Sequence, residues 1–186
     1  AAQVAEATPH PNIEYRVASA EASGLPSSSI DLVTTAEALH WFDTEAFLNE
    51  VRRVLKPEGR VAIWVYDFCS ARESQIDSIY RDFYGGPISP YWPPERASVE
   101  QNYANLKLPI PRVEQPQFEI KQLMTCAQFC GYLRSWSAVK RYYDTHGVDP
   151  VESIEAELRV CWGDEARIVR WPLTLFFGAP SHKAQD

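Results

Sequence analysis

The sequence has no Gly-x-Gly among its 186 residues, so it lacks the glycine-rich turn that brings a backbone close to a bound dinucleotide. Long hydrophobic runs are missing as well. The longest, Val61 to Tyr66, is far shorter than the roughly 20 residues that a membrane-spanning helix needs. The 18 basic residues are outnumbered by 25 acidic ones, and we find no basic stripe. A net charge of −7 therefore argues against nucleic acid or a membrane surface as a partner.

Cysteine is also scarce, with four residues in the chain. Such a number in a chain of this length does not indicate a disulfide framework. Cys126 and Cys130 are one helical turn apart and would share a face, but two thiols without a second pair make a poor zinc site. We expect free thiols, no metal and a reducing, cytoplasmic compartment.

The remaining composition is that of one globular domain, with 45% hydrophobic and 23% charged residues. We expect a single domain made of three parts: residues 1–68, residues 69–116 and residues 117–186. The chain starts at Ala1 without methionine, and its first seven residues have the composition of a helix already under way. We therefore expect the domain to be incomplete at its N-terminus.

Residues 1–68 have the pattern of a parallel sheet with a crossover helix. Apolar residues alternate over residues 13–19, which predicts a short strand, and residues 30–35 form a compact apolar strand. Asp43 is placed to cap a helix, which Pro57 and Gly59 end. Residues 60–68 then predict a covered strand. A strand–helix–strand unit gives a parallel pair, with ligands beyond the carboxyl ends of the strands.

The later parts have a different pattern. Half of the 14 prolines lie between residues 87 and 116, which predicts a cover over a cleft and no further sheet. Residues 118–123 predict a strand, and Thr125 with Gln128 predicts a capping box at the start of a helix. Asp149 begins another helix, and residues 168–177 predict a last strand that pairs with residues 118–123.

Several short motifs occur in an order that points to one family. They are RVASAE at 16–21, LP at 25–26, IDLV at 30–33, AEALHWF at 36–42 and RVLKPEG at 53–59. Together they resemble the class I S-adenosylmethionine-dependent methyltransferases with a methyltransferase type 11 domain. The run ALHWF is similar to the trans-aconitate methyltransferase-like subgroup, as are YWPPER at 91–96 and LRSWS at 133–137.

The resemblance implies an α/β fold with a doubly wound, Rossmann-like and mostly parallel sheet that has an antiparallel end. In that family a first strand ends in a glycine-rich turn and a second strand ends in an acid that binds the ribose. Both would precede Ala1, so the resemblance implies a domain that lacks its first two strands. The strand at residues 30–35 would then have an unpaired apolar edge. We expect this chain alone to bind the cofactor poorly and to be inactive.

The resemblance also implies S-adenosyl-L-methionine as the cofactor and places parts of its site. Ser19, Ala20 and Glu21 occupy the loop that holds the adenine. Ala36 and Glu37 would lie beside the methionine part, where small residues let the backbone approach. The alternatives are that residues 19–21 only begin a loop or a short helix and that Glu37 is an ordinary solvated carboxylate.

The same comparison places His40 and Trp41 against the cofactor sulfur and the acceptor, as cofactor-binding and catalytic residues. The alternative is that both are structural. Trp92, Arg134 and Trp136 are the candidates for binding the acceptor, and the charge of Arg134 would suit an acidic molecule.

Methyl transfer from a sulfonium needs alignment and a dry site more than acid–base chemistry. A carboxylate acceptor is already ionised at pH 7, whereas a phenol or amine acceptor would use His40 as a base. We expect a small-molecule acceptor, by analogy a carboxylic acid. The alternatives are a non-enzymatic remnant with a partner-binding surface and a fragment of an NAD-type oxidoreductase. The acceptor and the oligomeric state remain open.

Overall fold

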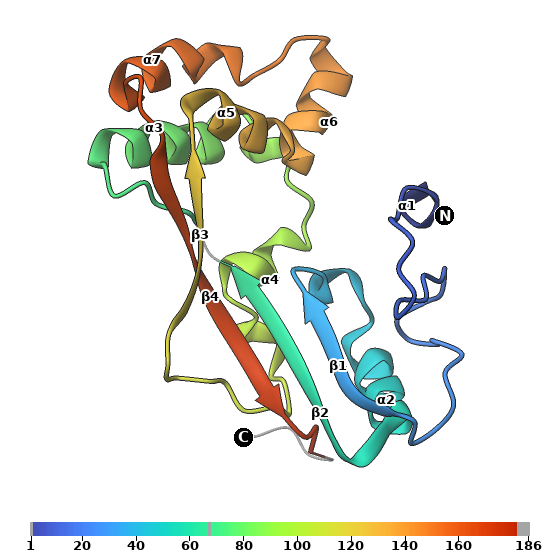
Figure 1. Cartoon of the computed structure of the whole chain (residues 1–186). Helices are drawn as coiled ribbons and strands as arrows, with labels where there is room; N and C mark the ends of the chain where they lie inside the picture. Colours follow the sequence, from blue (N-terminus) through green and yellow to red (C-terminus); the bar gives the residue numbers. More distant parts are fainter. Residues whose placement is uncertain (1, 67, 182–186) are drawn as a thin grey trace.

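A computed structural model describes residues 2–66 and 68–181. Within them the strands β1 (Ile30–Ala36), β2 (Leu55–Tyr66), β3 (Phe118–Met124) and β4 (Arg167–Gly178) form a sheet in the order β1-β2-β4-β3. The β1–β2 pair is parallel, and the other two pairs are antiparallel. Figure 1 shows β1 at one edge of the sheet and β3 at the other.

The predicted crossover unit is confirmed. Helix α2 (Thr44–Val54) connects β1 to β2, and the Asp43 side chain accepts a hydrogen bond from the Ala46 amide at 3.0 Å. Strand β2 begins at Leu55, directly after the helix, which is earlier than predicted. It ends at Tyr66, and residue 67 of the predicted strand lies outside the described residues. Because the pair is parallel, the carboxyl ends of β1 and β2 lie side by side at the same end of the strands.

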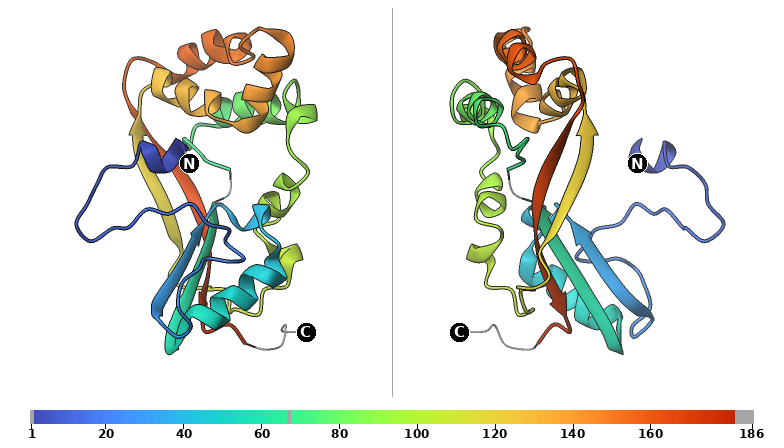
Figure 2. Two further views of the ribbon diagram at one scale, coloured as in Figure 1. Left: turned by 90° about the vertical axis from the view of Figure 1, so that its right-hand side faces the viewer. Right: turned by 60° about the vertical axis from the view of Figure 1, so that its left-hand side comes forward.

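The predicted antiparallel end is confirmed as well. Strand β3 pairs with β4 so that Leu123 lies opposite Ile168, and β4 continues along β2, with Phe176 opposite Ile63. In Figure 2, β3 and β4 twist away from β1 and β2 and connect the sheet to a layer of helices.

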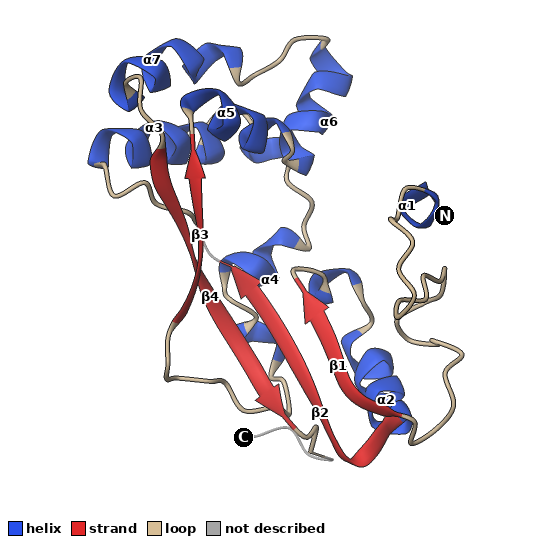
Figure 3. Cartoon of the chain, in the orientation of Figure 1, coloured by secondary structure: helices blue, strands red, loops and turns tan. Residues whose placement is uncertain are grey.

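This layer consists of α3 (Ser74–Gly85), α5 (Cys126–Arg134), α6 (Ser137–His146) and α7 (Glu152–Trp162). Figure 3 shows these helices gathered at the end of the molecule where β3 ends. The predicted capping box of Thr125 and Gln128 is present at α5. Buried aromatic and aliphatic side chains, among them Phe83, Leu133 and Trp162, join the four helices in one hydrophobic core.

Helix α3 was not predicted, because the prolines that follow it dominate the segment 69–116. Beyond α3 that segment forms a cover with little regular structure. It contains two 3-10 turns, η2 (Ser89–Tyr91) and η3 (Ala104–Leu106), and the short helix α4 (Arg96–Glu100). Buried residues of this cover and of η1 (Leu39–Trp41) form a second core against β2 and α2.

The strand predicted at residues 13–19 is wrong. After the short helix α1 (Ala2–Ala5), the chain forms isolated bridges of His10 with Ile13 and of Ser19 with Ala22, but no ladder. Val17 is 70% exposed. An alternating pattern becomes a strand only beside a second strand, and none of the described strands lies along this segment (Figure 1). Within the described residues no helix is long and apolar enough to cross a membrane.

Candidate active site

Glu37 follows β1 and turns its side chain toward the end of β2. Its backbone has a positive φ of 49°, which reverses the chain direction just after the strand. The amide donates to the Trp64 carbonyl at 2.9 Å, and Oε2 accepts from the Tyr66 amide at 3.0 Å. Burial raises the pKa of this carboxyl, against the nearby Tyr66 amide and Arg96 charge, which lower it. Glu37 therefore holds a half-buried carboxylate at the carboxyl ends of both parallel strands.

His40 lies one turn further along, in η1. Leu39 beside it is fully buried and fastens the turn to the core, while Trp41 remains 55% exposed. The rings of His40 and Trp41 are 4.8 Å apart. The Nδ1 atom of His40 is 3.0 Å from the hydroxyl of Tyr103, which comes from the cover. Burial lowers the pKa of His40, and the positive charge of Arg96 lowers it further.

Arg96 completes this group from α4, and sequence reasoning missed it. Its guanidinium carbon is 5.0 Å from the centre of the Trp92 ring and 5.8 Å from that of Tyr84, distances typical of cation–π contacts. Its Nη1 atom is 3.7 Å from Oε1 of Glu37. Its sequence signal was its position at the end of the motif YWPPER at 91–96, directly after aromatic and proline residues.

Two of the three predicted acceptor-binding residues adjoin this group. Trp92 lies 5.6 Å from Trp136 between ring centres, and Tyr84 contacts both rings. Arg134 has a different environment, because its guanidinium forms ion pairs of 2.6 Å with Asp149 and with Glu155. These contacts raise the pKa of Arg134. No contact of the described residues joins Arg134 to Glu37, His40 or Arg96.

The predicted adenine loop lies beside the same strand end. Ser19 donates its hydroxyl to the Glu21 carboxylate, and Oε1 of Glu21 accepts from the Asp43 amide at 3.1 Å. The Ser19 bond is the main reason why the pKa of Glu21 is lowered. Ala20 packs against the core that contains Leu39. The loop at residues 19–21 is thereby fastened to the turn that carries His40 and Trp41.

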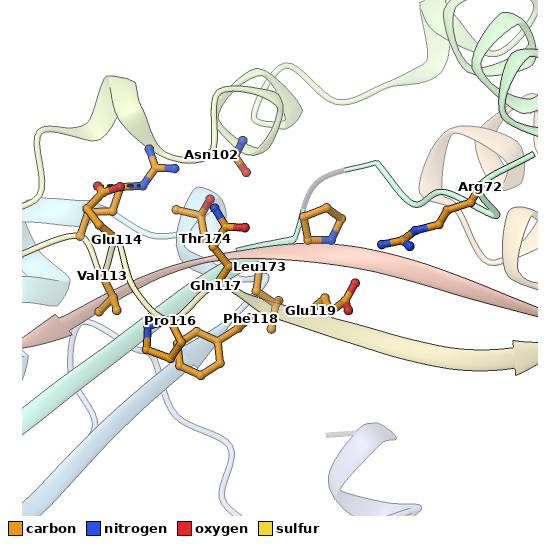
Figure 4. A pocket seen from close by; sticks show the side chains of 12 residues that line it. Arg72, Asn102, Val113, Glu114, Pro116, Gln117, Phe118, Glu119, Leu173 and Thr174 are labelled. Carbon is orange, nitrogen blue, oxygen red and sulfur yellow. Dashed lines mark ion pairs between the residues drawn. The ribbon is translucent and has the colours of Figure 1, made fainter. Parts of the chain in front are cut away.

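A cavity of about 520 Å³ lies away from this group. Figure 4 shows it between the segment that contains Asn102 and the strands β3 and β4, with Arg72 at one end and Glu114 at the other. None of the predicted site residues lines it. Asn102 faces this cavity, while the next residue, Tyr103, contacts His40.

All four cysteines are free thiols, and they lie outside the group around Glu37. Cys69 and Cys130 are buried, whereas Cys126 and Cys161 are partly exposed. Burial raises the pKa of Cys69 and of Cys130 to about 12. With these pKa values both thiols are protonated at neutral pH, so neither is an activated nucleophile.

Comparison with known proteins gives consistent matches. A family model described as a methyltransferase domain matches residues 1–63. Among solved structures, a proposed type II methyltransferase from Anaeromyxobacter dehalogenans is 37% identical and superposes with a TM-score of 0.84. The match covers 96% of this chain and 76% of that one.

Two curated relatives match over shorter parts of their length. A proposed methyltransferase of Dictyostelium discoideum is 28% identical over 158 residues, which is 84% of this chain and 60% of the relative. An uncharacterized methyltransferase of Schizosaccharomyces pombe is 38% identical over 81 residues, which is 42% of this chain and 32% of the relative. This chain thus spans less than two thirds of the length of these two relatives.

Proposed function

The chain belongs to the class I S-adenosylmethionine-dependent methyltransferases, and on this premise we propose that the protein transfers a methyl group from S-adenosyl-L-methionine to a small-molecule acceptor. The observation that carries the proposal is the convergence of Glu37, His40 and Arg96 at the carboxyl ends of β1 and β2. In open α/β sheets, ligands bind beyond the carboxyl ends of the parallel strands.

The residues present fit the cofactor at two points. Oε1 of Glu37 is buried without a hydrogen-bond partner, so it is an acceptor suited to the ammonium group of the methionine part. Ala36 beside it is small and exposed, which leaves the backbone accessible. Ser19, Ala20 and Glu21 would hold the adenine through the Ser19 oxygen and a backbone amide. When bound, the cofactor supplies a methyl group on a positively charged sulfur.

The chain's own residues would orient the reactants and exclude water. Trp41 presents an exposed ring next to His40, suited to a cation–π contact with a sulfonium. Trp92 and Trp136 would form an apolar wall on the acceptor side. Such a wall would exclude water and hold the reactants in the orientation that an in-line displacement requires.

We propose a carboxylic acid as the acceptor, and Arg96 as the residue that binds it. Arg96 projects into the group around Glu37, and its guanidinium presents donors that match the two oxygens of a carboxylate. Arg134 carries the same chemistry but is engaged by Asp149 and Glu155. We therefore prefer Arg96 over Arg134 for this role.

The test is a transfer assay with tritium-labelled methyl on the cofactor, using the protein encoded by the complete gene. The panel contains small carboxylic acids, phenols and amines. We expect label in an ester of a carboxylic acid. A protein that binds the cofactor but labels none of these compounds would contradict the proposed reaction, and labelled phenols or amines alone would contradict the acceptor class.

We also propose that the 186 residues alone bind the cofactor weakly. Strand β1 pairs on one side with β2 and has no partner strand on its other side among the described residues, and Leu32 on this strand is 50% exposed. An unpaired apolar edge of this kind favours self-association over ligand binding. Isothermal titration of the chain with S-adenosylmethionine is the measurement, and a micromolar dissociation constant would refute this proposal.

A further inference from the structure

Tyr103 is the one side chain of the cover that forms a hydrogen bond with His40 in the part of the chain that the structure describes. Its side chain is 1% exposed, and its hydroxyl lies 3.0 Å from Nδ1 of the imidazole. No described residue forms a hydrogen bond with the other ring nitrogen, Nε2, which is free to meet a ligand. What His40 can do chemically therefore depends on which of its two nitrogens carries the proton.

The surroundings of the Tyr103 hydroxyl decide this question. A phenol has one proton to donate and lone pairs that accept. Among the described residues, the Tyr103 hydroxyl forms one hydrogen bond, and its partner is Nδ1 of His40. Because the side chain is buried, a hydroxyl proton that pointed away from Nδ1 would have no acceptor. The single proton is therefore directed to Nδ1 of His40, which must be the accepting nitrogen.

Both groups have the protonation states that this arrangement requires. The low pKa of His40, caused by burial and by Arg96 against the opposing charge of Glu95, keeps the ring neutral at pH 7. The pKa of Tyr103 is raised by burial and by the Glu37 carboxylate, so the phenol keeps its proton. A neutral imidazole that accepts at Nδ1 carries its proton at Nε2.

The backbone that presents Tyr103 is unusual as well. Asn102 and Tyr103 have positive φ angles of 50° and 60°, consecutive left-handed conformations that residues with side chains seldom adopt. Each such conformation is strained and persists where the surrounding structure demands it. The two conformations direct Asn102 to the cavity of Figure 4 and Tyr103 to His40.

We propose that Tyr103 is a positioning residue that fixes His40 with its proton on Nε2, so that His40 donates a hydrogen bond to the methyl acceptor and does not remove a proton from it. This inference rests on the proposed methyl transfer and restricts the chemical class of the methyl acceptor. A phenol or a protonated amine must lose a proton during transfer, and here the histidine is in the wrong tautomer to take it. The site is built for an acceptor that is already ionised.

A carboxylate meets this condition, and the transfer then balances without a proton. A carboxylate oxygen forms a bond to the methyl carbon while the carbon–sulfur bond breaks, and that electron pair stays on sulfur. The sulfonium becomes a neutral thioether, and the carboxylate becomes a neutral ester. His40 and Arg96 donate hydrogen bonds to the acceptor throughout and hold the attacking oxygen in line.

The tautomer is directly measurable. Long-range proton–nitrogen NMR correlations of the ¹⁵N-labelled chain at pH 7, without cofactor, distinguish the two forms of a neutral histidine. The chain has four histidines, and the His40 signals are identified by their loss in H40Q. We expect the Nε2–H pattern for His40 in the unsubstituted chain, and an Nδ1–H pattern there would overturn the proposal.

Substitution of Tyr103 provides the second measurement. Y103F removes the hydroxyl, and we expect the His40 signals to move toward a mixture of tautomers. Y91F is the matched control, because it removes the hydroxyl of the tyrosine that contacts His146. It should change the His146 signals and leave those of His40 in place. An unchanged His40 pattern in Y103F would contradict a positioning role. Since neither spectrum requires turnover, both remain informative if methyl transfer itself is disproved.

Kinetic measurements on the protein encoded by the complete gene distinguish two roles of His40, a hydrogen-bond donor and a general base. Gln can donate a hydrogen bond in place of Nε2 but is no base at neutral pH. We expect H40A to lose about 10- to 100-fold in kcat/KM, the usual effect of one bond to a charged group, and H40Q to recover a large part of that loss. If H40Q and H40A lose kcat/KM equally while their thermal unfolding midpoints stay unchanged, His40 acts as a base and the proposal is overturned.

Discussion

Nη1 of Arg96 lies 3.7 Å from Oε1 of Glu37, close enough for an ion pair and too far for a hydrogen bond. The carboxylate oxygen is buried and has no hydrogen-bond partner, and the guanidinium lies over the Trp92 ring and donates from Nε to the Tyr84 hydroxyl at 3.2 Å. The two charges compensate each other across a gap while each keeps unused hydrogen-bonding capacity. Such a pair would offer an acceptor to an amino group on one side and donors to a carboxylate on the other.

The first prediction concerns Arg96. In the protein encoded by the complete gene, R96Q should raise the KM for a carboxylate acceptor about 10- to 100-fold, because one charge-assisted contact is lost. R96K should recover part of the loss, since Lys keeps the charge but not the fork of donors. R134Q is the matched control and should leave this KM within about 2-fold. A larger effect of R134Q than of R96Q would return the role to Arg134.

The second prediction concerns the exposed ring of Trp41. If it faces the sulfonium, W41A should weaken binding of S-adenosylmethionine more than binding of S-adenosylhomocysteine, whose sulfur is neutral. A cation–π contact of about 0.5–2 kcal/mol corresponds to a difference of roughly 2- to 30-fold. W41F keeps an aromatic face and should retain most of the discrimination. Equal losses for both ligands, measured by titration calorimetry, would show that Trp41 only fills space.

The sequence was sufficient where local pattern and tertiary pairing agree. Asp43 caps α2 as predicted, because helix signals are local, and Phe47 and Val51 on this helix are buried. The alternation at residues 13–19 was as clear, but a strand must pair with a second strand. The sequence of the segment does not show whether such a strand is present. Local pattern therefore predicted the crossover unit and failed for the isolated segment.

The same limit applies to the candidate site. His40, Trp41 and Glu37 were predicted from the resemblance to the methyltransferase family, and they follow a strand directly, so that their position is one that sequence can locate. Arg96 and Tyr103 reach the same point from a cover with little periodicity, more than 50 residues further along the chain. Their contacts depend on how the cover folds over β2, and no spacing rule encodes this. Arg134 looked equally suitable until its partners Asp149 and Glu155 were known.

The third prediction concerns stability and involves Glu50. This buried carboxylate accepts from the amide and hydroxyl of Ser23, at 2.9 and 2.6 Å, and forms an ion pair with Arg53 at 2.7 Å. It thus joins the loop after residue 22 to α2. E50Q should lower the free energy of unfolding by about 1–3 kcal/mol, the usual effect of losing hydrogen bonds to a charged group. E45Q, at an exposed site in the same helix, is the control and should change it little.

The pH dependence of this effect follows from the same contacts. Hydrogen bonds from Arg53 and then from Ser23 lower the pKa of Glu50 from 4.5 to about 2. Because the folded pKa is depressed, the contribution is fully present above pH 4.5 and is lost as the pH falls toward 2. The difference in stability between the unsubstituted chain and E50Q should shrink over this window in urea titrations. A difference that stays constant down to pH 2 would show that the charge of Glu50 is not what matters.

The last prediction separates the two contacts that hold the proposed adenine loop. Glu21 accepts from the Asp43 amide and from Ser19, so its carboxylate joins the loop to the turn at the start of α2. In E21A the loop loses this link, and Ser19 loses its partner. We expect the affinity for S-adenosylmethionine to fall about 3- to 10-fold in the protein encoded by the complete gene. S19A removes the hydroxyl but keeps the bond from Asp43 to Glu21, so a comparable loss in S19A would indicate direct contact with the adenine. A loss confined to E21A would indicate that the loop needs only its position, and unchanged affinity in both variants would remove residues 19–21 from the cofactor site.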